Sequence, residues 1–152
     1  MKRREAIGLT ATAITGTILG ANSFGKSKQQ SEDEKKKLKV MVFGAHPDDP
    51  ETGCGGVISK FSSYGHEVHA VYLTRGEAGI EGKSHKDAAK IRMIEANNAC
   101  AILKAKPIFL DQIDGATEVN NERYDKVSIL ISEIKPDIIL THWPIDSHRD
   151  HQ

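Results

Sequence analysis

The sequence lacks an excess of charge of either sign, because Lys plus Arg and Asp plus Glu number 21 each. This balance argues against a broadly basic nucleic-acid-binding protein, so we expect no nucleic-acid partner. Cysteine is scarce, and the two residues present are too few for a disulfide framework. Long apolar runs are also missing, which excludes a multi-span membrane protein. The 38% hydrophobic and 28% charged fractions are those of one ordinary globular domain.

The N-terminus has the pattern of an export signal, predicted over residues 1–23. Lys2, Arg3 and Arg4 form a positive region, and residues 6–21 are mildly apolar and uncharged. The paired arginines resemble a twin-arginine signal. We therefore expect an exported, extracytoplasmic protein, either periplasmic or secreted, with no stable membrane span after cleavage. The alternative is a protein retained by its uncleaved N-terminal segment.

A charged linker is predicted over residues 24–37. From Gly25 to Lys37 the chain runs through Lys, Ser, Gln, Glu and Asp with nothing apolar, a composition typical of a solvated segment. The folded domain is therefore expected over residues 38–152.

Short apolar strands alternate with amphipathic helices along that domain. Strands are predicted at residues 38–45, 67–74, 107–110 and 137–141, and helices at 51–64, 86–104 and 121–134. This order is typical of a parallel sheet covered on both faces. The predicted fold class is α/β, a Rossmann-like three-layer sandwich with a mainly parallel sheet.

Polar side chains gather where each predicted strand ends. They are His46, Asp48 and Asp49 after the first strand, Arg75 after the second, Asp114 after the third, and His148, Asp150 and His151 after the fourth. In parallel sheets, ligands bind beyond the carboxyl ends of the strands. We therefore expect these side chains to line one site.

An imidazole and two carboxylates within four residues indicate a cation site at the carboxyl ends of the predicted strands. His46 and Asp49 are able to turn toward one cation, while Asp48 lies beside it. The cluster at residues 148–151 offers a third ligand. Two histidines and one carboxylate leave a position open for water, as catalytic Zn²⁺ requires, and the same set suits Fe²⁺. The alternative is a plain turn capped by aspartate.

Two of these stretches resemble one known family. Residues 45–51 (AHPDDPE) match the A-H-P-D-D-x-E signature of the LmbE-like, or PIG-L, metal-dependent N-acetylglucosaminide deacetylases. Residues 144–151 (PIDSHRDH) match its P-x-D-x-H-x-D-H signature, and residues 74–79 (TRGEAG) look like its second strand loop. The resemblance runs from about Lys39 to the end of the chain.

The resemblance implies a role for each matching residue. His46, Asp49 and His151 would be the metal ligands, Asp48 the general base, and His148 the second catalytic group. Arg75 and Asp114 would contact sugar hydroxyls. Asp150 is expected to orient a neighbouring imidazole. Outside the motifs, we expect His142 to lie outside the site and Arg92 to pair with Glu95 in a structural role.

The expected activity is metal-dependent hydrolysis. The resemblance implies removal of the N-acetyl group from a substrate containing N-acetylglucosamine, a small molecule or a glycan, giving acetate and a free amino sugar. Two alternatives stay open: hydrolysis of another amide in a sugar conjugate, and a non-catalytic carbohydrate- or metal-binding module. Family members generally continue past the second signature, so we expect a domain truncated at its C-terminus and weak or no activity of this fragment. The sequence predicts no oligomeric state.

Overall fold

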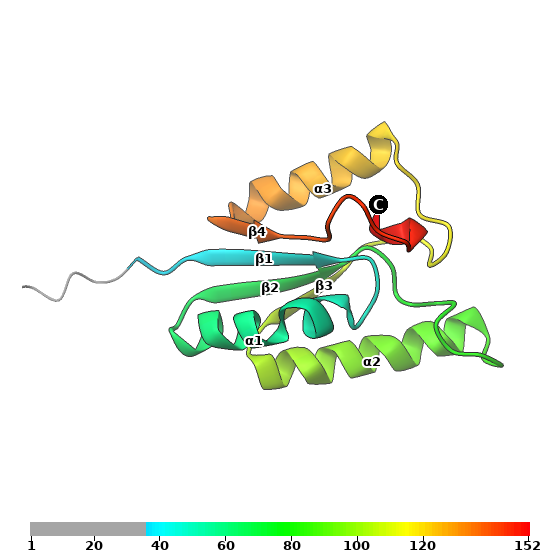
Figure 1. Ribbon diagram of the computed structural model, residues 1–152, viewed down its shortest axis with the longest axis horizontal. Helices are drawn as coiled ribbons and strands as arrows, with labels where there is room; N and C mark the ends of the chain where they lie inside the picture. Colours follow the sequence, from blue (N-terminus) through cyan, green and yellow to red (C-terminus); the bar gives the residue numbers. More distant parts are fainter. Residues whose placement is uncertain (1–35) are drawn as a thin grey trace, which may run out of the picture. The chain divides into compact units, whose positions relative to one another are not determined.

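A computed structural model describes residues 36–152 (Figure 1). The predicted export signal and all but the last two residues of the predicted linker lie outside the described residues. The elements follow in the order β1 (Lys39–Gly44), α1 (Asp49–Ser63), β2 (Glu67–Tyr72), α2 (His85–Leu103), β3 (Lys106–Phe109), α3 (Asn121–Ile134), β4 (Ile138–Leu140) and the 3₁₀ turn η1 (Arg149–His151). In the described residues, no helix is both long and apolar enough to cross a membrane.

The four strands form one parallel sheet in the order β3-β2-β1-β4. Helices α1 and α2 cover one face of the sheet, and α3 lies over the other (Figure 1). This arrangement confirms the predicted α/β class. In β1, Val42 is in register with Ala70 of β2 and with Leu140 of β4. The carboxyl ends of the three strands therefore reach the same edge of the sheet.

The principal core lies between β1, β2 and α1. Val40, Val42, Val68 and Ile58 are at most 2% exposed and pack as one cluster. Burial of such side chains stabilises the fold by roughly 1.5–3 kcal/mol each. Gly44 ends β1, and a Cβ there would lie 2.6 Å from Asp49 Cβ. Glycine therefore lets the end of β1 approach the first turn of α1.

Helix α2 packs through small side chains rather than through its isoleucines. Ala88, Ala96 and Cys100 are buried, whereas Ile94 and Ile102 are 52% and 83% exposed. These two isoleucines therefore face solvent rather than the sheet. Small side chains allow the helix to lie close to β2 and β3, where Ala96 and Cys100 contact Ala70 and Tyr72.

Helix α3 is held differently from the other two helices. None of its residues, all of which are described, is buried. Its apolar side chains Tyr124, Val127 and Ile131 line a cleft of about 900 Å³ between the helix and the sheet. The same cleft is lined by His142, Asp150 and His151 at the carboxyl edge of the sheet.

Candidate active site

The turn after β1 places the first group of polar side chains. Asp49 is the first residue of α1, and Pro50 follows it, where its missing amide costs no helical hydrogen bond. The Asp49 Oδ2 atom accepts a hydrogen bond from the His46 amide at 2.7 Å, and the Asp49 amide donates to the His46 carbonyl at 3.2 Å. These bonds close a tight turn that brings the His46 ring and the Asp49 carboxylate together.

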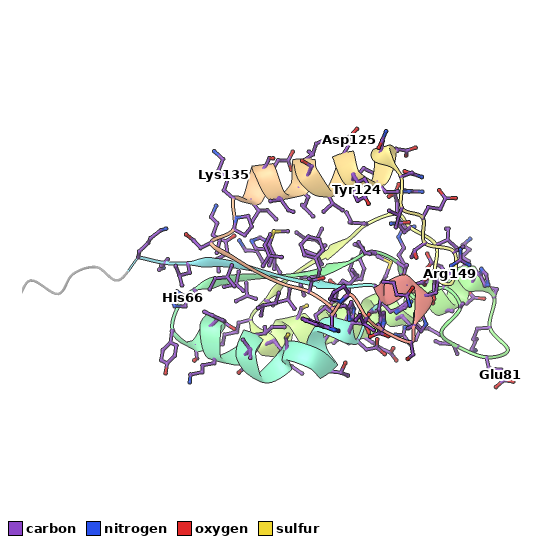
Figure 2. The ribbon with its side chains drawn as sticks, turned by 45° about the horizontal axis from the view of Figure 1, so that its top comes forward. His66, Glu81, Tyr124, Asp125, Lys135 and Arg149 are labelled. Carbon is purple, nitrogen blue, oxygen red and sulfur yellow. The ribbon has the colours of Figure 1, made fainter. Side chains whose placement is uncertain are left out.

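The segment after β4 places the second group. Because β4 pairs in parallel with β1, the chain leaves both strands at the same edge. In Figure 2, Arg149 of η1 lies at this edge and His66 lies at the other end of the sheet. The Asp146 carboxylate accepts a hydrogen bond from the His148 amide at 2.7 Å, which holds the loop before η1.

The Asp49 carboxylate is surrounded by imidazole nitrogens. Its Oδ2 atom lies 3.3 Å from His46 Nδ1, 3.3 Å from His142 Nε2 and 3.4 Å from His151 Nε2. Burial disfavours a charged carboxylate, but hydrogen bonds from the His46 ring and amide outweigh it and hold the pKa of Asp49 well below its ordinary value. Asp49 is therefore an anion at neutral pH.

The other nitrogen of His46 faces two further carboxylates. His46 Nε2 lies 3.1 Å from Asp150 Oδ2 and 3.1 Å from Asp114 Oδ1. Burial disfavours the imidazolium, but the hydrogen bonds to Asp49 and Asp150 and the nearby charges outweigh burial, and the pKa of His46 rises to about 9. A cation in this cluster, whether a proton or a metal ion, is thus strongly favoured.

Asp150 is a positioning group rather than a free ligand. Its buried carboxylate accepts hydrogen bonds from the Gly115 amide at 2.7 Å, from the Thr117 hydroxyl at 2.9 Å and from the His46 ring at 3.1 Å. Burial works against the anion, yet these donors keep the pKa of Asp150 below its ordinary value. A carboxylate with its lone pairs engaged in this way fixes the orientation of the imidazole beside it.

His142 belongs to the cluster, contrary to the sequence expectation. Its ring stacks on that of His151 with centroids 4.0 Å apart and an interplanar angle of 6°. The Ala45 amide donates to His142 Nε2 at 3.4 Å. The signal that would have found it is strand register, because Leu140 pairs with Val42 and residue 142 therefore lies beside the end of β1.

His148 lies at the exposed side of the cluster. Its ring centroid is 4.8 Å from that of His46 and 4.6 Å from that of His151. The Asp150 amide donates to His148 Nδ1 at 3.2 Å. When the ring is neutral, this bond places its proton on Nε2, so His148 is able to donate a hydrogen bond to a ligand.

The structure does not place Asp48 and Arg75 among these rings. The Asp48 side chain is 59% exposed and forms an ion pair with Arg92 at 3.0 Å. Arg92 therefore pairs with Asp48, and Glu95, its expected partner, is exposed. Arg75 lines a separate cleft with Phe109 and Lys126. Asp114, a predicted sugar contact, instead faces His46 and accepts a bond from the Ala78 amide at 3.0 Å.

The donor set fits a divalent metal. Zn²⁺ with bonds of about 2.0–2.1 Å to nitrogen and oxygen separates neighbouring tetrahedral ligands by about 3.3 Å, close to the spacings between Asp49 Oδ2 and its three imidazole nitrogens. Compact groups of potential ligands are His46 with His148 and His151, Asp49 with His142 and His151, and His46 with Asp114 and Asp150. The last group is the weakest candidate for a metal site, because the Asp150 carboxylate already accepts hydrogen bonds from other groups. The predicted ligands His46, Asp49 and His151 share members with the first two groups.

Comparison with known proteins gives a consistent family relationship. Residues 41–152 match the PIG-L family, described as GlcNAc-PI de-N-acetylase. A deacetylase from Escherichia coli K12, YaiS, itself uncharacterised, is 30% identical over 76% of this chain. The structure of N,N'-diacetylchitobiose deacetylase from Pyrococcus horikoshii is 31% identical over 77% of this chain, with a TM-score of 0.72.

The same fold also occurs in a protein with another activity. The 4-carboxy-2-hydroxymuconate hydratase from Pseudomonas putida superposes with a TM-score of 0.70, but at 24% identity this likeness concerns the fold alone. The chain spans 63% of the length of YaiS and 46% of the Pyrococcus structure.

Proposed function

This chain belongs to the PIG-L family of deacetylases, and from that premise we propose that it takes part in metal-dependent removal of the N-acetyl group from a substrate containing N-acetylglucosamine. The products are acetate and a free amino sugar. The observation that carries the proposal is the Asp49 carboxylate, which lies 3.3–3.4 Å from nitrogens of three histidines at the carboxyl edge of a parallel sheet. The family description and the Pyrococcus relative support an N-acetylated sugar as substrate.

His46, Asp49 and His151 would hold the metal, with Zn²⁺ as the proposed ion and Fe²⁺ as the alternative that suits the same donors. A bound divalent cation supplies Lewis acidity and lowers the pKa of bound water from about 15.7 to about 7 in well-studied zinc hydrolases. The Asp150 Oδ2 atom lies 3.1 Å from His46 Nε2 and so holds the His46 ring in place. His142 stacks on His151 and limits the rotation of that ring.

The remaining chemistry belongs to side chains of the chain itself. Asp48 takes a proton from the attacking water while the oxygen of that water bonds to the acetyl carbon. The His148 Nε2–H group donates a hydrogen bond to the carbonyl oxygen as negative charge develops there, an interaction typically worth about 3–4 kcal/mol. When the carbon–nitrogen bond breaks, the proton held by Asp48 passes to the leaving amine.

The test is acetate release from N,N'-diacetylchitobiose by the zinc-loaded 152-residue chain and by its Asp48→Asn variant. We expect the wild type to release acetate slowly, as the weak activity expected of this fragment implies, and the variant to release it roughly 10²-fold or more slowly still, the usual contribution of a general base. Asp125→Asn, an exposed change on α3 labelled in Figure 2, is the matched control and should match the wild type. A zinc-loaded wild type that releases no acetate would contradict the proposal, as would equal rates for Asp48→Asn.

We also propose that the chain works outside the cytoplasm. Support comes from the positive residues Lys2, Arg3 and Arg4 followed by the apolar run at residues 6–21. In that compartment, the substrates available are extracytoplasmic glycans or glycoconjugates. The alternative, retention by the uncleaved segment, leaves the catalytic domain on the same side of the membrane.

A further inference from the structure

Glu77 is a buried carboxylate, in the loop between β2 and α2, that the proposed chemistry does not use. It is 8% exposed, and burial of a carboxylate is unfavourable unless hydrogen-bond donors compensate for the lost water. Its Oε2 atom accepts hydrogen bonds from the Arg75 amide at 3.2 Å and from the Asp114 amide at 3.4 Å. One carboxylate oxygen therefore joins the loop after β2 to the loop after β3.

The connection between these two loops is reciprocal. While Glu77 accepts from the amide of Asp114, the Asp114 Oδ2 atom accepts from the Ala78 amide at 3.0 Å. A glycine with positive φ lies beside each carboxylate, Gly76 at 70° and Gly115 at 79°, a conformation that glycine adopts readily. Each loop therefore turns sharply at the point where it presents its carboxylate to the other.

The main chain at residues 114 and 115 places two carboxylates against His46. The Asp114 Oδ1 atom lies 3.1 Å from His46 Nε2. The next amide, that of Gly115, donates to Asp150 Oδ2 at 2.7 Å, and this oxygen also lies 3.1 Å from His46 Nε2. A group that fixes this stretch of main chain therefore fixes both partners of the imidazole nitrogen.

The two carboxylates decide which nitrogen of His46 is open to a metal ion. Ionised carboxylates only accept hydrogen bonds, so they favour the ring proton on Nε2. A neutral ring protonated there keeps a lone pair on Nδ1, the atom that lies 3.3 Å from Asp49 Oδ2. The direction of that lone pair depends on how firmly Asp114 and Asp150 hold the other side of the ring.

We propose that Glu77 is a positioning residue that orients His46 for metal binding by holding the main chain of Asp114. The proposal rests on the proposed function for the role of His46 as a metal ligand. Both hydrogen bonds of Glu77 go to main-chain amides. It therefore acts through residues 114 and 115 and makes no contact with the metal itself.

The first experiment observes the His46 ring in the metal-free chain. An imidazole proton held by carboxylates is protected from exchange with water, so ¹H–¹⁵N spectra should show the Nε2–H signal, assigned by its loss in His46→Gln. Glu77→Met should remove the signal. Glu81→Met, a change of an exposed carboxylate in the same loop (Figure 2), is the charge-matched control and should keep it. A signal that is absent from the wild type, or unchanged in Glu77→Met, would overturn the proposal.

The second experiment measures zinc affinity by competition with a chelator. Glu77→Met should raise the Kd for Zn²⁺ roughly 10- to 100-fold, the usual effect of losing a group that orients a metal ligand. Glu81→Met should leave the Kd at the wild-type value. An unchanged Kd in Glu77→Met would contradict the proposal.

Two conservative variants separate the reach of the side chain from its charge. Glu77→Gln keeps an oxygen that accepts from both amides, so its zinc Kd and its His46 ring signal should stay close to those of the wild type. Glu77→Asp keeps the charge but is one methylene shorter, so its Kd should rise although its fold is the least disturbed. The opposite order, with Glu77→Asp the tighter binder, would show that charge rather than positioning matters.

A double-mutant cycle tests the route through Asp114. In the Asp114→Ala background, Glu77→Met should raise the zinc Kd by a smaller factor than in the wild type, because one of the two carboxylates that it positions is already gone. Equal factors in the two backgrounds would contradict the proposal. A wild type that binds no zinc would count against the proposed function alone, since the ring signal still decides whether Glu77 orients His46.

Discussion

At the scale of single residues, the site is organised by carboxylates that hold imidazoles in fixed orientations. His46 illustrates this, because Asp49 faces its Nδ1 atom and Asp150 and Asp114 face its Nε2 atom. The motif predicted which residue types meet here. It did not predict that Asp114 would face His46, since that contact depends on how the loop after β3 folds back.

The protonation of His46 should make the stability of the metal-free chain depend on pH. Hydrogen bonds to Asp49 and Asp150 outweigh burial and raise the pKa of His46 from 6.5 to about 9 in the folded chain. The stabilisation is therefore fully present below pH 6.5 and is lost as the pH rises through about 9. Urea unfolding in EDTA should show that the free energy of unfolding falls by on the order of 1–3 kcal/mol between pH 6.5 and about pH 9.

The comparison for this prediction is His46→Gln, which should lose the extra pH dependence. His85→Gln, an exposed histidine at the start of α2, should keep it. If the unfolding free energies of the wild type and His46→Gln changed equally between pH 6.5 and 9, the His46 ring would not be held as an imidazolium.

At the scale of elements, the sequence predicted the strands and helices well and their contacts less well. The alternation of apolar strands and amphipathic helices correctly predicted the parallel sheet. Periodicity did not identify the buried face of α2, because close packing there selects Ala88, Ala96 and Cys100 over larger isoleucines. Nor did it place His142 or pair Arg92 with Asp48, because both contacts join segments far apart in the sequence.

Helices α1 and α3 should contribute very differently to stability. Ile58 of α1 is 1% exposed in the core, so Ile58→Ala should cost about 2–5 kcal/mol. Ile131 of α3 lines the cleft of about 900 Å³, so Ile131→Ala should cost less than about 1 kcal/mol. Urea unfolding of the two matched variants measures the difference. Equal costs would show that α3 is packed against the sheet as tightly as α1.

At the scale of the whole molecule, the proposed ligands come from opposite ends of the described region. His46 and Asp49 follow the first strand, and His151 lies in η1 after the last strand, at the edge of the sheet that they share. A metal ion at this edge would join the two segments. Metal binding and the docking of η1 on the sheet should therefore be coupled.

Zinc should therefore stabilise the folded chain, and this effect should depend on His151. A ligand that binds only the folded state at about 100 times its Kd adds about 2.7 kcal/mol to the unfolding free energy. Thermal unfolding should show a higher Tm with zinc, reversed by EDTA, while His151→Ala should lose most of the increase and His85→Gln should keep it. A zinc-induced rise in Tm of the same size in His151→Ala would mean that the ion is held elsewhere. The end of the chain would then have no part in the metal centre.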